Sequence, residues 1–442
     1  MTIEEIKDKI LDDQELVTDR SYFKRDYSLL PREGFAIVLT GTRRSGKSSL
    51  LRLYAQNLIK EGVGQNRICY LSFFDSSFPA NECRIDQIAK AFYSLYPASM
   101  KETVYFLLDE VQKLDKWGEG VSRLMDKYDC RVIVTGSSAK FLSTDIATEL
   151  RGRSISKKFF PLSFREFLRF NGKELGRSDS FSEKEQIELM NLFELYVERG
   201  SYPALYNIDS KEERREILSS YFSMTFSIDL IERFEVTKAN VLQVLLKRLV
   251  LTSGTPLSLR RLKHYMDSIG VKTSLETISS YLEMVKDTMF MRELKILGNE
   301  NVQNTNPIKL YTADHVMPSL FYSFTKNTGL MYEHIVFSAL QRKYQNIFYY
   351  KTKSGYEIDF VVTDGLNKAM MLVQVTDDYE TAKERENRSF YEAVKELRCD
   401  NCFIVTRETM EEIMMEGKTI RILPIWRFLL LLDSEKLLLS RS

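Results

Sequence analysis

The sequence predicts an α/β protein in which the N-terminal third forms a parallel sheet covered by helices. Short apolar runs there alternate with segments whose apolar residues recur at helical spacing, a pattern typical of such sheets. A glycine-rich segment directly follows the first apolar run, at residues 41–48. The chain has 442 residues, enough for about three domains, so further domains must follow the sheet.

The first third is expected to contain five strands and three helices. The expected strands are Phe35–Thr40, Arg67–Phe73, Val104–Asp109, Arg131–Gly136 and Ile155–Phe160, the last closed by Pro161. The expected helices between them are Lys47–Lys60, Ile85–Tyr96 and Gly118–Tyr128. Apolar residues recur at helical spacing in each of the three helical segments.

From Ser163 the pattern becomes helical. Ser163 with Glu166 and Ser182 with Glu185 have the spacing of capping boxes, in which a hydroxyl and a carboxylate bind free N–H groups at a helix start. The second of these helices is expected to run to about Arg199. Another helix is expected at Lys211–Glu232. Three more, at Val241–Leu251, Leu257–Ser268 and Leu275–Val285, are followed by the hairpin-like stretch Met289–Leu297, the succession of a winged helix–turn–helix.

A second α/β segment is expected beyond Ile308. Its expected elements are a helix at Leu330–Tyr344, strands at Ile347–Lys351, Glu357–Val362 and Met370–Thr376, a helix at Thr381–Leu397, and strands at Asn401–Val405 and Ile420–Leu423. We therefore divide the chain into an N-terminal extension (1–20), a sheet core (21–162), a helical lid (163–237), a winged helix–turn–helix (238–300) and a C-terminal α/β domain (301–442).

Composition argues against several classes of protein. Lys and Arg number 63 against 62 Asp and Glu, so the chain is no polycation and a nucleic-acid contact needs a local basic patch. Five scattered cysteines do not make a disulfide framework, and the pair Cys399 and Cys402 lacks the second pair that structural zinc needs. The N-terminus has no signal-peptide core, and the apolar run Phe428–Leu432 is too short to cross a bilayer. We expect a cytoplasmic protein without a membrane partner.

The segment GTRRSGKS matches the phosphate-binding pattern G-x-x-x-x-G-K-[ST] and lies between an expected strand and an expected helix. Its glycines let the backbone N–H groups turn towards a phosphate, beside the positive end of the helix dipole. We expect Lys47 to reach the β- and γ-phosphates and Ser48 to hold Mg²⁺. The expected nucleotide-binding residues are Gly41, Thr42, Arg43, Arg44, Ser45, Gly46, Lys47, Ser48 and Ser49.

Two acidic residues, Asp109 and Glu110, end the strand at Val104–Asp109. We expect Asp109 to bind Mg²⁺ directly or through water, and Glu110 to polarise the attacking water. Thr135 and Ser137 follow the next strand, where they either contact the water or γ-phosphate, with Ser137 as a sensor, or only form a turn. Arg153 in the segment LRGRS is either an arginine finger supplied from a neighbouring subunit or a solvated basic residue.

These motifs resemble one AAA+-type ATPase family of archaea and bacteria. The resemblance rests on the phosphate loop, the strand ending in Asp109–Glu110, the T-G-S-S strand end (135–138) and the segment LRGRSISKKFFPLSFREF. The segment GSYPAL fits a Gly-Gly-Tyr-Pro element of that family, with Ser201 in place of the second glycine. The resemblance implies a parallel sheet with a strand inserted between those next to Lys47 and Asp109, a helical lid, a winged helix and a restriction-endonuclease-like C-terminal domain. It also implies ATP as ligand and a homo-oligomer that brings Arg153 in trans.

The C-terminal segment resembles the restriction-endonuclease fold through Glu333 on a helix, the strand GYEIDF and the strand LVQVT. In active members an Asp and a Glu chelate Mg²⁺ and a nearby Lys activates water. Asp359 matches the Asp, but Gln374 replaces the Glu and Thr376 replaces the Lys. Glutamine brings no charge and threonine cannot replace an ammonium group. We therefore expect a degenerate site at Glu333, Asp359 and Gln374 that does not cleave DNA.

Residues 238–297 contain ten Lys and Arg against five Asp and Glu, with Arg260, Arg261 and Lys263 clustered. This net charge of +5 favours contact with double-stranded DNA, although basic residues on helices are often only solvated. We expect an ATP phosphohydrolase coupled to DNA or protein partners through the winged helix and the C-terminal domain. Three functions remain open: a DNA-associated motor or remodeller, favoured by the intact Asp109–Glu110 pair, a slow nucleotide-controlled switch, favoured by Thr376, and an ATP-dependent nuclease.

Overall fold

The computed structural model describes residues 1–74, 82–137, 149–176, 180–321 and 328–434. The chain forms two compact units. The first unit contains Met1–Pro161 and the short segment Asp287–Met289, and the second contains Leu162–Lys286 and Phe290–Ser442. Among the described residues, we find no helix that combines the length and the apolar character needed to cross a bilayer.

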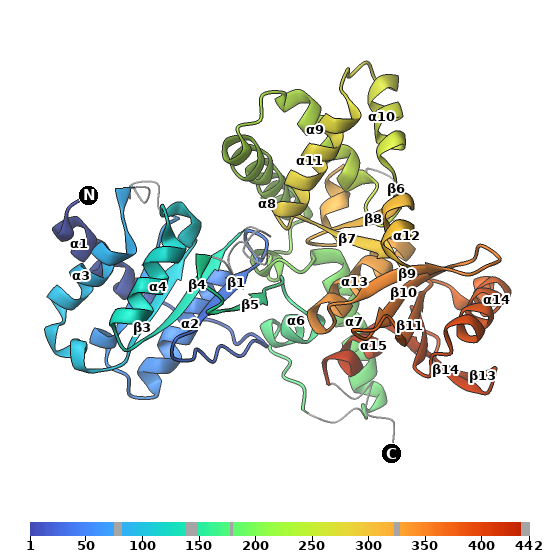
Figure 1. Cartoon of the computed structure of the whole chain (residues 1–442). Coiled ribbons are helices and arrows are strands. Elements are labelled where there is room, and N and C mark those ends of the chain that lie inside the picture. Colours follow the sequence, from blue (N-terminus) through green and yellow to red (C-terminus); the bar gives the residue numbers. More distant parts are fainter. Residues whose placement is uncertain (75–81, 138–148, 177–179, 322–327, 435–442) are drawn as a thin grey trace. The chain divides into compact units, whose positions relative to one another are not determined.

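The first unit is built on a parallel sheet of five strands (Figure 1). The strands, in the spatial order β2–β3–β4–β1–β5, are β2 (Ile68–Ser72), β3 (Val104–Asp109), β4 (Cys130–Gly136), β1 (Ala36–Thr40) and β5 (Ser154–Lys158). The predicted α/β fold with a parallel sheet is confirmed. Strand β4 lies between β3 and β1, which is the inserted-strand arrangement that the resemblance implied.

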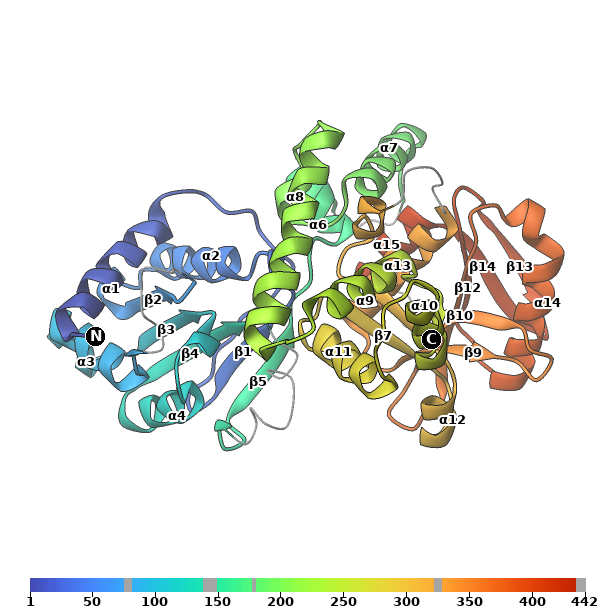
Figure 2. The same cartoon turned by 90° about the horizontal axis from the view of Figure 1, so that it is seen from above.

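Successive residues of a strand point to opposite faces of the sheet. Both faces of this sheet therefore carry apolar side chains, and helices cover both. Val38 and Phe106 pack with α1 (Ile3–Thr18), α3 (Ile85–Leu95) and α4 (Trp117–Lys127), whereas their neighbours Ile37 and Leu107 pack with α2 (Lys47–Lys60). Figure 2 shows α2 and α4 on opposite sides of the sheet. The carboxyl ends of β1, β3 and β4 therefore share one edge of a sheet that is buried on both faces.

Helix α1, which lies in the predicted N-terminal extension, packs on the sheet of the first unit. The side chain of Thr2 accepts a hydrogen bond from Glu5 N and completes a capping box. At the other end of the helix, Ser72 N donates to Asp13 Oδ2 (2.8 Å) and Gln14 Nε2 donates to Ile68 O (2.7 Å). These contacts satisfy polar groups at the exposed edge of β2, so α1 protects an edge that could otherwise pair with another strand.

The N-terminal half of the second unit is helical. Its helices are α6 (Phe164–Phe170), α7 (Glu183–Arg199), α8 (Lys211–Met224), α9 (Ala239–Leu251), α10 (Leu259–Ser268) and α11 (Leu275–Asp287). The two predicted capping boxes, Ser163 with Glu166 and Ser182 with Glu185, are confirmed. A helix is present where Lys211–Glu232 was predicted, but Thr225–Glu232 is π-helical and the helical conformation continues to Phe234.

The rest of the second unit is a nine-stranded sheet with helices on both sides. The strands, in spatial order, are β13 (Glu411–Met415), β14 (Lys418–Pro424), β12 (Cys402–Thr406), β11 (Ala369–Val375), β10 (Glu357–Thr363), β9 (Ile347–Lys351), β7 (Met291–Ile296), β8 (Ile308–Thr312) and β6 (Pro256–Leu257). The remaining helices are α12 (Glu300–Thr305), α13 (Thr328–Lys343), α14 (Tyr379–Leu397) and α15 (Ile425–Asp433).

The prediction of an extended hairpin at Met289–Leu297 was wrong. This stretch holds the single strand β7, whose antiparallel partner β8 follows after α12. The cause is local: the side chain of Asn299 accepts a hydrogen bond from Val302 N and starts α12 soon after β7, so the chain does not turn back within this stretch. Strand β7 also pairs in parallel with β9, at Lys295–Phe348 and Ile296–Tyr349, which joins the two halves of the sheet.

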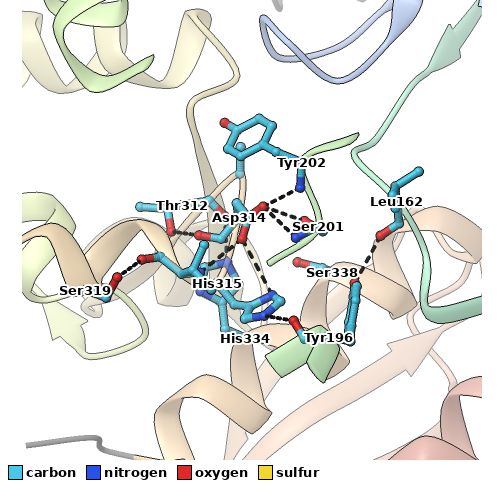
Figure 3. A network of polar contacts seen from close by, with 12 residues as sticks. Leu162, Tyr196, Ser201, Tyr202, Thr312, Asp314, His315, Ser319, His334 and Ser338 are labelled. Atoms are coloured by element: carbon cyan, nitrogen blue, oxygen red, sulfur yellow. Dashed lines mark hydrogen bonds and ion pairs between the residues drawn. The ribbon is translucent and has the colours of Figure 1, made fainter. Parts of the chain in front are cut away.

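A buried hydrogen-bond network centred on Asp314 ties the end of α7 to the segment after β8 (Figure 3). Asp314 Oδ2 accepts from Ser201 N (2.7 Å), Ser201 Oγ (2.9 Å) and Tyr202 N (2.7 Å), and Asp314 Oδ1 accepts from Val316 N (3.0 Å). Gly200 has a φ of +88°, and a Cβ there would lie 2.5 Å from Val316 Cγ2. The glycine of the GSYPAL segment is therefore required, whereas Ser201 contributes a donor.

Candidate nucleotide site

The phosphate loop runs from the end of β1 to the start of α2, as its motif requires. Gly46 has a φ of +101° at the helix N-cap, a conformation that favours glycine. Gly41 leaves no room for a side chain, because a Cβ there would clash with Phe159 O. The expected binding residues differ in exposure: Gly41, Thr42, Ser45 and Lys47 are buried, Arg43, Gly46 and Ser48 are half-buried, and Arg44 and Ser49 are exposed.

Lys47 is 4% exposed and lies within the loop. Its Nζ donates to Gly41 O (2.8 Å) and Thr42 O (3.2 Å) and lies 3.5 Å from Glu110 Oε1. Ser45 Oγ also donates to Thr42 O (2.8 Å). The carbonyl acceptors of Lys47 are neutral, so they attract its ammonium group less strongly than an anionic phosphate does. The geometry is therefore suited to exchanging them for an anion.

Asp109 and Glu110 stand at the end of β3, next to the end of β4. Thr135 Oγ1 donates to Asp109 Oδ1 (2.6 Å) and accepts from Glu110 N (2.9 Å), so this threonine fixes both acidic residues. Ser48 also donates a hydrogen bond to Asp109. Glu110 has a φ of +57°, in the left-handed region that costs a non-glycine residue free energy. The hydrogen bond from Glu110 N to Thr135 Oγ1 holds Glu110 in this conformation.

Ser137, the predicted sensor, contacts the acidic pair. Its Oγ donates to Glu110 Oε2 (3.0 Å), and Gln112 Nε2 donates to the same oxygen. Gln112 was missed in the sequence analysis, although its position two residues after Glu110 could have suggested a contact. Ser138, the last residue of the T-G-S-S motif, lies outside the described residues.

The environment moves the pKa values of the two carboxyl groups in opposite directions. Burial and the neighbouring charge of Glu110 raise the pKa of Asp109, and hydrogen bonds from Ser48 and Thr135 oppose this only in part. Burial also opposes ionisation of Glu110, but Lys47, Gln112, Arg43 and Ser137 together hold the pKa of Glu110 below its usual value. Glu110 is therefore the more readily ionised carboxylate of the pair.

Arg153, the predicted finger residue, is paired within its own unit. Its Nη1 lies 2.6 Å from Asp126 Oδ1, and its Nη2 donates to Ser122 O (3.4 Å), both on α4. The pairing lowers the pKa of Asp126. An approach of Arg153 to the phosphates of another copy would have to break this ion pair, which is largely exposed and therefore weak.

The second unit contains another acidic centre, with a lysine that the sequence analysis missed. Lys309, on β8, is 2% exposed. Its Nζ lies 2.9 Å from Glu333 Oε1, 2.9 Å from Glu357 Oε1 and 4.0 Å from Asp359 Oδ1. Burial alone would lower the pKa of Lys309, but the three carboxylates raise it above its usual value. The ammonium group therefore stays charged at the centre of the cluster.

The residues predicted for a degenerate nuclease site, Glu333, Asp359 and Gln374, all lie at this centre. Gln374 Oε1 accepts from Asp359 N (3.2 Å), so the amide oxygen proposed as a weak metal ligand already has a partner. Asp359 Oδ2 accepts from Val375 N (2.8 Å). Burial and the charge of Glu333 raise the pKa of Asp359 well above its usual value, although Lys309 opposes this. Within the described ranges, no group of three or more His, Cys, Asp or Glu side chains could hold a metal ion.

The predicted DNA-contact residues lie on α10. Arg260 and Arg261 are exposed, whereas Lys263 is half-buried and pairs with Asp267 (2.5 Å). The following helix, α11, exposes Glu276 and Glu283. The positive charge of this segment is therefore concentrated at the start of α10 and does not extend along α11.

Three family models match the chain. A model described as an AAA domain matches residues 33–168, and two models described as domains of unknown function, DUF8612 and DUF4143, match residues 190–327 and 328–428. Among solved structures, the Aeropyrum pernix ORC1 protein in complex with DNA is similar over 72% of this chain and 90% of its own, at 13% identity. The TM-score of 0.28 is too low to carry a conclusion.

Two curated relatives cover most of the chain. An uncharacterized protein of Haemophilus influenzae is 28% identical over 74% of this chain and 79% of its own length. The uncharacterized protein MJ1544 of Methanocaldococcus jannaschii is 31% identical over 95% of this chain and 93% of its own. The phosphate loop and the acidic strand end both lie within the matched AAA domain, and the chain, which carries this domain, belongs to the same family as MJ1544.

Proposed function

We propose that the protein binds and hydrolyses ATP with Mg²⁺. The observation that carries this proposal is the position of Glu110, whose carboxylate lies 3.5 Å from the Lys47 ammonium group and beside Asp109. Water polarised by Glu110 would then be next to the phosphates that Lys47 binds. The choice of ATP as the nucleotide rests on the family resemblance.

Each residue has a separate role in this proposal. Lys47 exchanges its carbonyl partners for the β- and γ-phosphates, and Glu110 accepts a hydrogen bond from the attacking water. Ser48 and Asp109 would hold Mg²⁺, and the hydrogen bond between their side chains supports this assignment because it brings their oxygens together. When bound, Mg²⁺ neutralises charge on the phosphates. Arg153 of a second copy could stabilise the transferring phosphoryl group.

The partners of Glu110 favour slow turnover. Glu110 Oε1 faces Lys47 and Oε2 accepts from Ser137 and Gln112, so both oxygens are engaged. Glu110 must therefore accept a hydrogen bond from water at Oε1, the oxygen that also faces the Lys47 ammonium group. This favours the alternative of a nucleotide-controlled switch, in which bound ATP persists and sets the state of the second unit, over a fast motor.

The substitution Glu110→Gln tests hydrolysis directly. We expect ATP binding to persist and steady-state turnover to fall on the order of 100-fold, because the amide is a poor base. Glu119→Gln is the matched control, since Glu119 is exposed on α4 and pairs with Arg123. Turnover that is unchanged in Glu110→Gln would contradict the proposed mechanism. Strong stimulation of the wild type by duplex DNA would favour the motor over the switch.

We also propose that the acidic centre of the second unit does not cleave DNA. Lys309 already supplies a cation to Glu333, Glu357 and Asp359, in the place that a nuclease reserves for Mg²⁺. The ATP-dependent nuclease is therefore the least favoured of the three functions. Mg²⁺-dependent cleavage of plasmid or linear DNA that is lost in Asp359→Ala would contradict this proposal.

Contact with double-stranded DNA through α10 remains a proposal, supported by the exposure of Arg260 and Arg261. The double substitution Arg260→Glu/Arg261→Glu should weaken binding to duplex DNA at low salt on the order of tenfold, because two phosphate contacts become repulsive. Lys263→Ala should have a smaller effect, since Lys263 pairs with Asp267. Equal affinity of the double variant and the wild type would exclude this surface and favour a protein partner.

A further inference from the structure

Arg25 connects the phosphate loop to the point where the chain leaves the first unit. It precedes β1 and is 6% exposed. Its Nη1 donates to Ser45 O in the loop (3.1 Å), and its Nη2 donates to Phe160 O (2.8 Å) and Pro161 O (3.3 Å). Its guanidinium also lies 4.5 Å from the centre of the Phe159 ring. One side chain thus contacts the loop and the last two residues of the unit.

The contact with Ser45 orients a peptide group of the loop. All peptide bonds of the described residues are trans, so the N–H of Gly46 points away from the carbonyl of Ser45. Because Arg25 binds that carbonyl, the Gly46 N–H is directed away from Arg25. Backbone N–H groups of such loops bind phosphate, so a fixed peptide plane lowers the cost of organising the site when nucleotide binds.

Further contacts join the loop to the end of β5. Phe159 N donates to Thr40 O (2.5 Å), Phe160 N donates to Tyr27 Oη (3.0 Å), and the missing side chain of Gly41 leaves room for Phe159 O. The loop therefore cannot shift at Gly41 or Ser45 without displacing residues 159–161. Since packed interiors transmit displacement, a change at the loop reaches Pro161.

On the other side of the junction, Leu162 is held by the second unit. Its N donates to Ser201 O (2.7 Å), and its O accepts from Tyr196 Oη (3.0 Å). Ser201 belongs to the Asp314 network (Figure 3). A single peptide bond, Pro161–Leu162, therefore joins a residue held by Arg25 to a residue held by the Asp314 network.

We propose that Arg25 is a positioning residue that couples nucleotide binding at the phosphate loop to the conformation of the Pro161–Leu162 junction. The proposal rests on the proposed nucleotide site and adds the path by which its occupancy reaches the second unit. Coupling of two sites is reciprocal: if nucleotide changes the junction, a change at the junction alters nucleotide affinity by the same factor.

The experiment measures ADP·Mg²⁺ affinity by calorimetry and hydrogen exchange of residues 159–162 with and without ADP, in the full chain. In the wild type we expect ADP to slow exchange of the Phe159, Phe160 and Leu162 amides. Arg25→Met should weaken ADP binding on the order of tenfold and abolish the exchange response. Arg52→Met is the control, since Arg52 is half-buried and, like Arg25, lies over an aromatic ring, that of Tyr70, yet contacts neither loop nor junction.

The variant Arg25→Lys keeps the charge but cannot reach the loop and the junction together, so it should lose the exchange response even if Arg25→Met is unstable. Exchange of the β4 amides without nucleotide reports whether each variant is folded. ADP binding with wild-type affinity and a normal junction response in Arg25→Lys would overturn the proposal and leave the nucleotide site intact. Absence of ADP binding in the folded wild type would instead overturn the proposed function, and this inference with it.

Discussion

Lys47 in the first unit and Lys309 in the second are both buried lysines beside carboxylates, but their partners differ. Lys47 donates to two backbone carbonyls and lies 3.5 Å from one carboxylate, in a loop whose ends are fixed by glycines. Lys309 lies 2.9 Å from two carboxylates and 4.0 Å from a third. Neutral partners can be exchanged for a phosphate, whereas a compensated charge cluster gains nothing from a ligand. The partners of a buried lysine, more than its burial, indicate whether it binds a ligand.

The largest expected effect concerns the acidic centre around Lys309. Lys309→Met should lower the free energy of unfolding by about 3–5 kcal/mol, because it leaves Glu333, Glu357 and Asp359 without a buried counter-charge. The measurement is chemical denaturation of the full chain. Lys351→Met is the matched control: Lys351 is far more exposed and lies 3.8 Å from Glu357, so the expected loss is about 0–1 kcal/mol. Equal losses in both variants would contradict the role of Lys309.

The next effect concerns the phosphate loop around Lys47. Lys47→Met should reduce ATP turnover on the order of 10²–10³-fold, since the ammonium group is the main positive charge facing the phosphates. The same variant should change stability by less than Lys309→Met does, because most partners of Lys47 are neutral. Turnover and denaturation are measured on one preparation, with Lys60→Met, at the far end of α2, as the control. If Lys47→Met lowered the free energy of unfolding as much as Lys309→Met does, the proposed difference between the two lysines would be contradicted.

The smallest effect concerns pH and a buried histidine of the second unit. Burial, Arg292 and His315 lower the pKa of His334 well below its usual value, and its Nε2 lies 2.6 Å from Thr312 O. In the unfolded chain His334 takes up a proton below about pH 6.5 that the folded chain does not, so stability falls as pH decreases. The loss attributable to His334 between pH 7 and 5.5 is about 1 kcal/mol. His334→Gln should remove this part of the slope, whereas exposed His264→Gln should not.

Much of the first unit could be predicted because its signals are local. The glycine motif, the strand that ends at Asp109 and the helix that begins at Lys47 are contiguous in sequence, and each favours the same fold. Gln112 was within reach of the same reasoning, since it follows Glu110 by two residues. Short elements were missed for a physical reason: β6 has two residues and α12 has six, too few for a periodic pattern.

Contacts between distant parts of the sequence could not be predicted. Arg25 bonds to Phe160, 135 residues away, and Asp314 bonds to Ser201, 113 residues away. Lys309 reaches Glu333 from a strand that the sequence analysis did not define, and nothing local marks that lysine as different from its neighbours. Such pairs arise from the packing of the sheet and helices, which a single sequence does not encode as a pattern.

The continuous sheet of the second unit has a consequence for how this protein can be divided into parts. The two models of unknown function meet between residues 327 and 328, but β7 on one side pairs with β9 on the other, and Lys309 neutralises Glu333 across the same boundary. A gene fusion that carried residues 328–428 alone would expose the edge of β9 and remove the Lys309 ammonium group from Glu333, Glu357 and Asp359. We therefore expect the two stretches to fold as one block, although two separate family models match them.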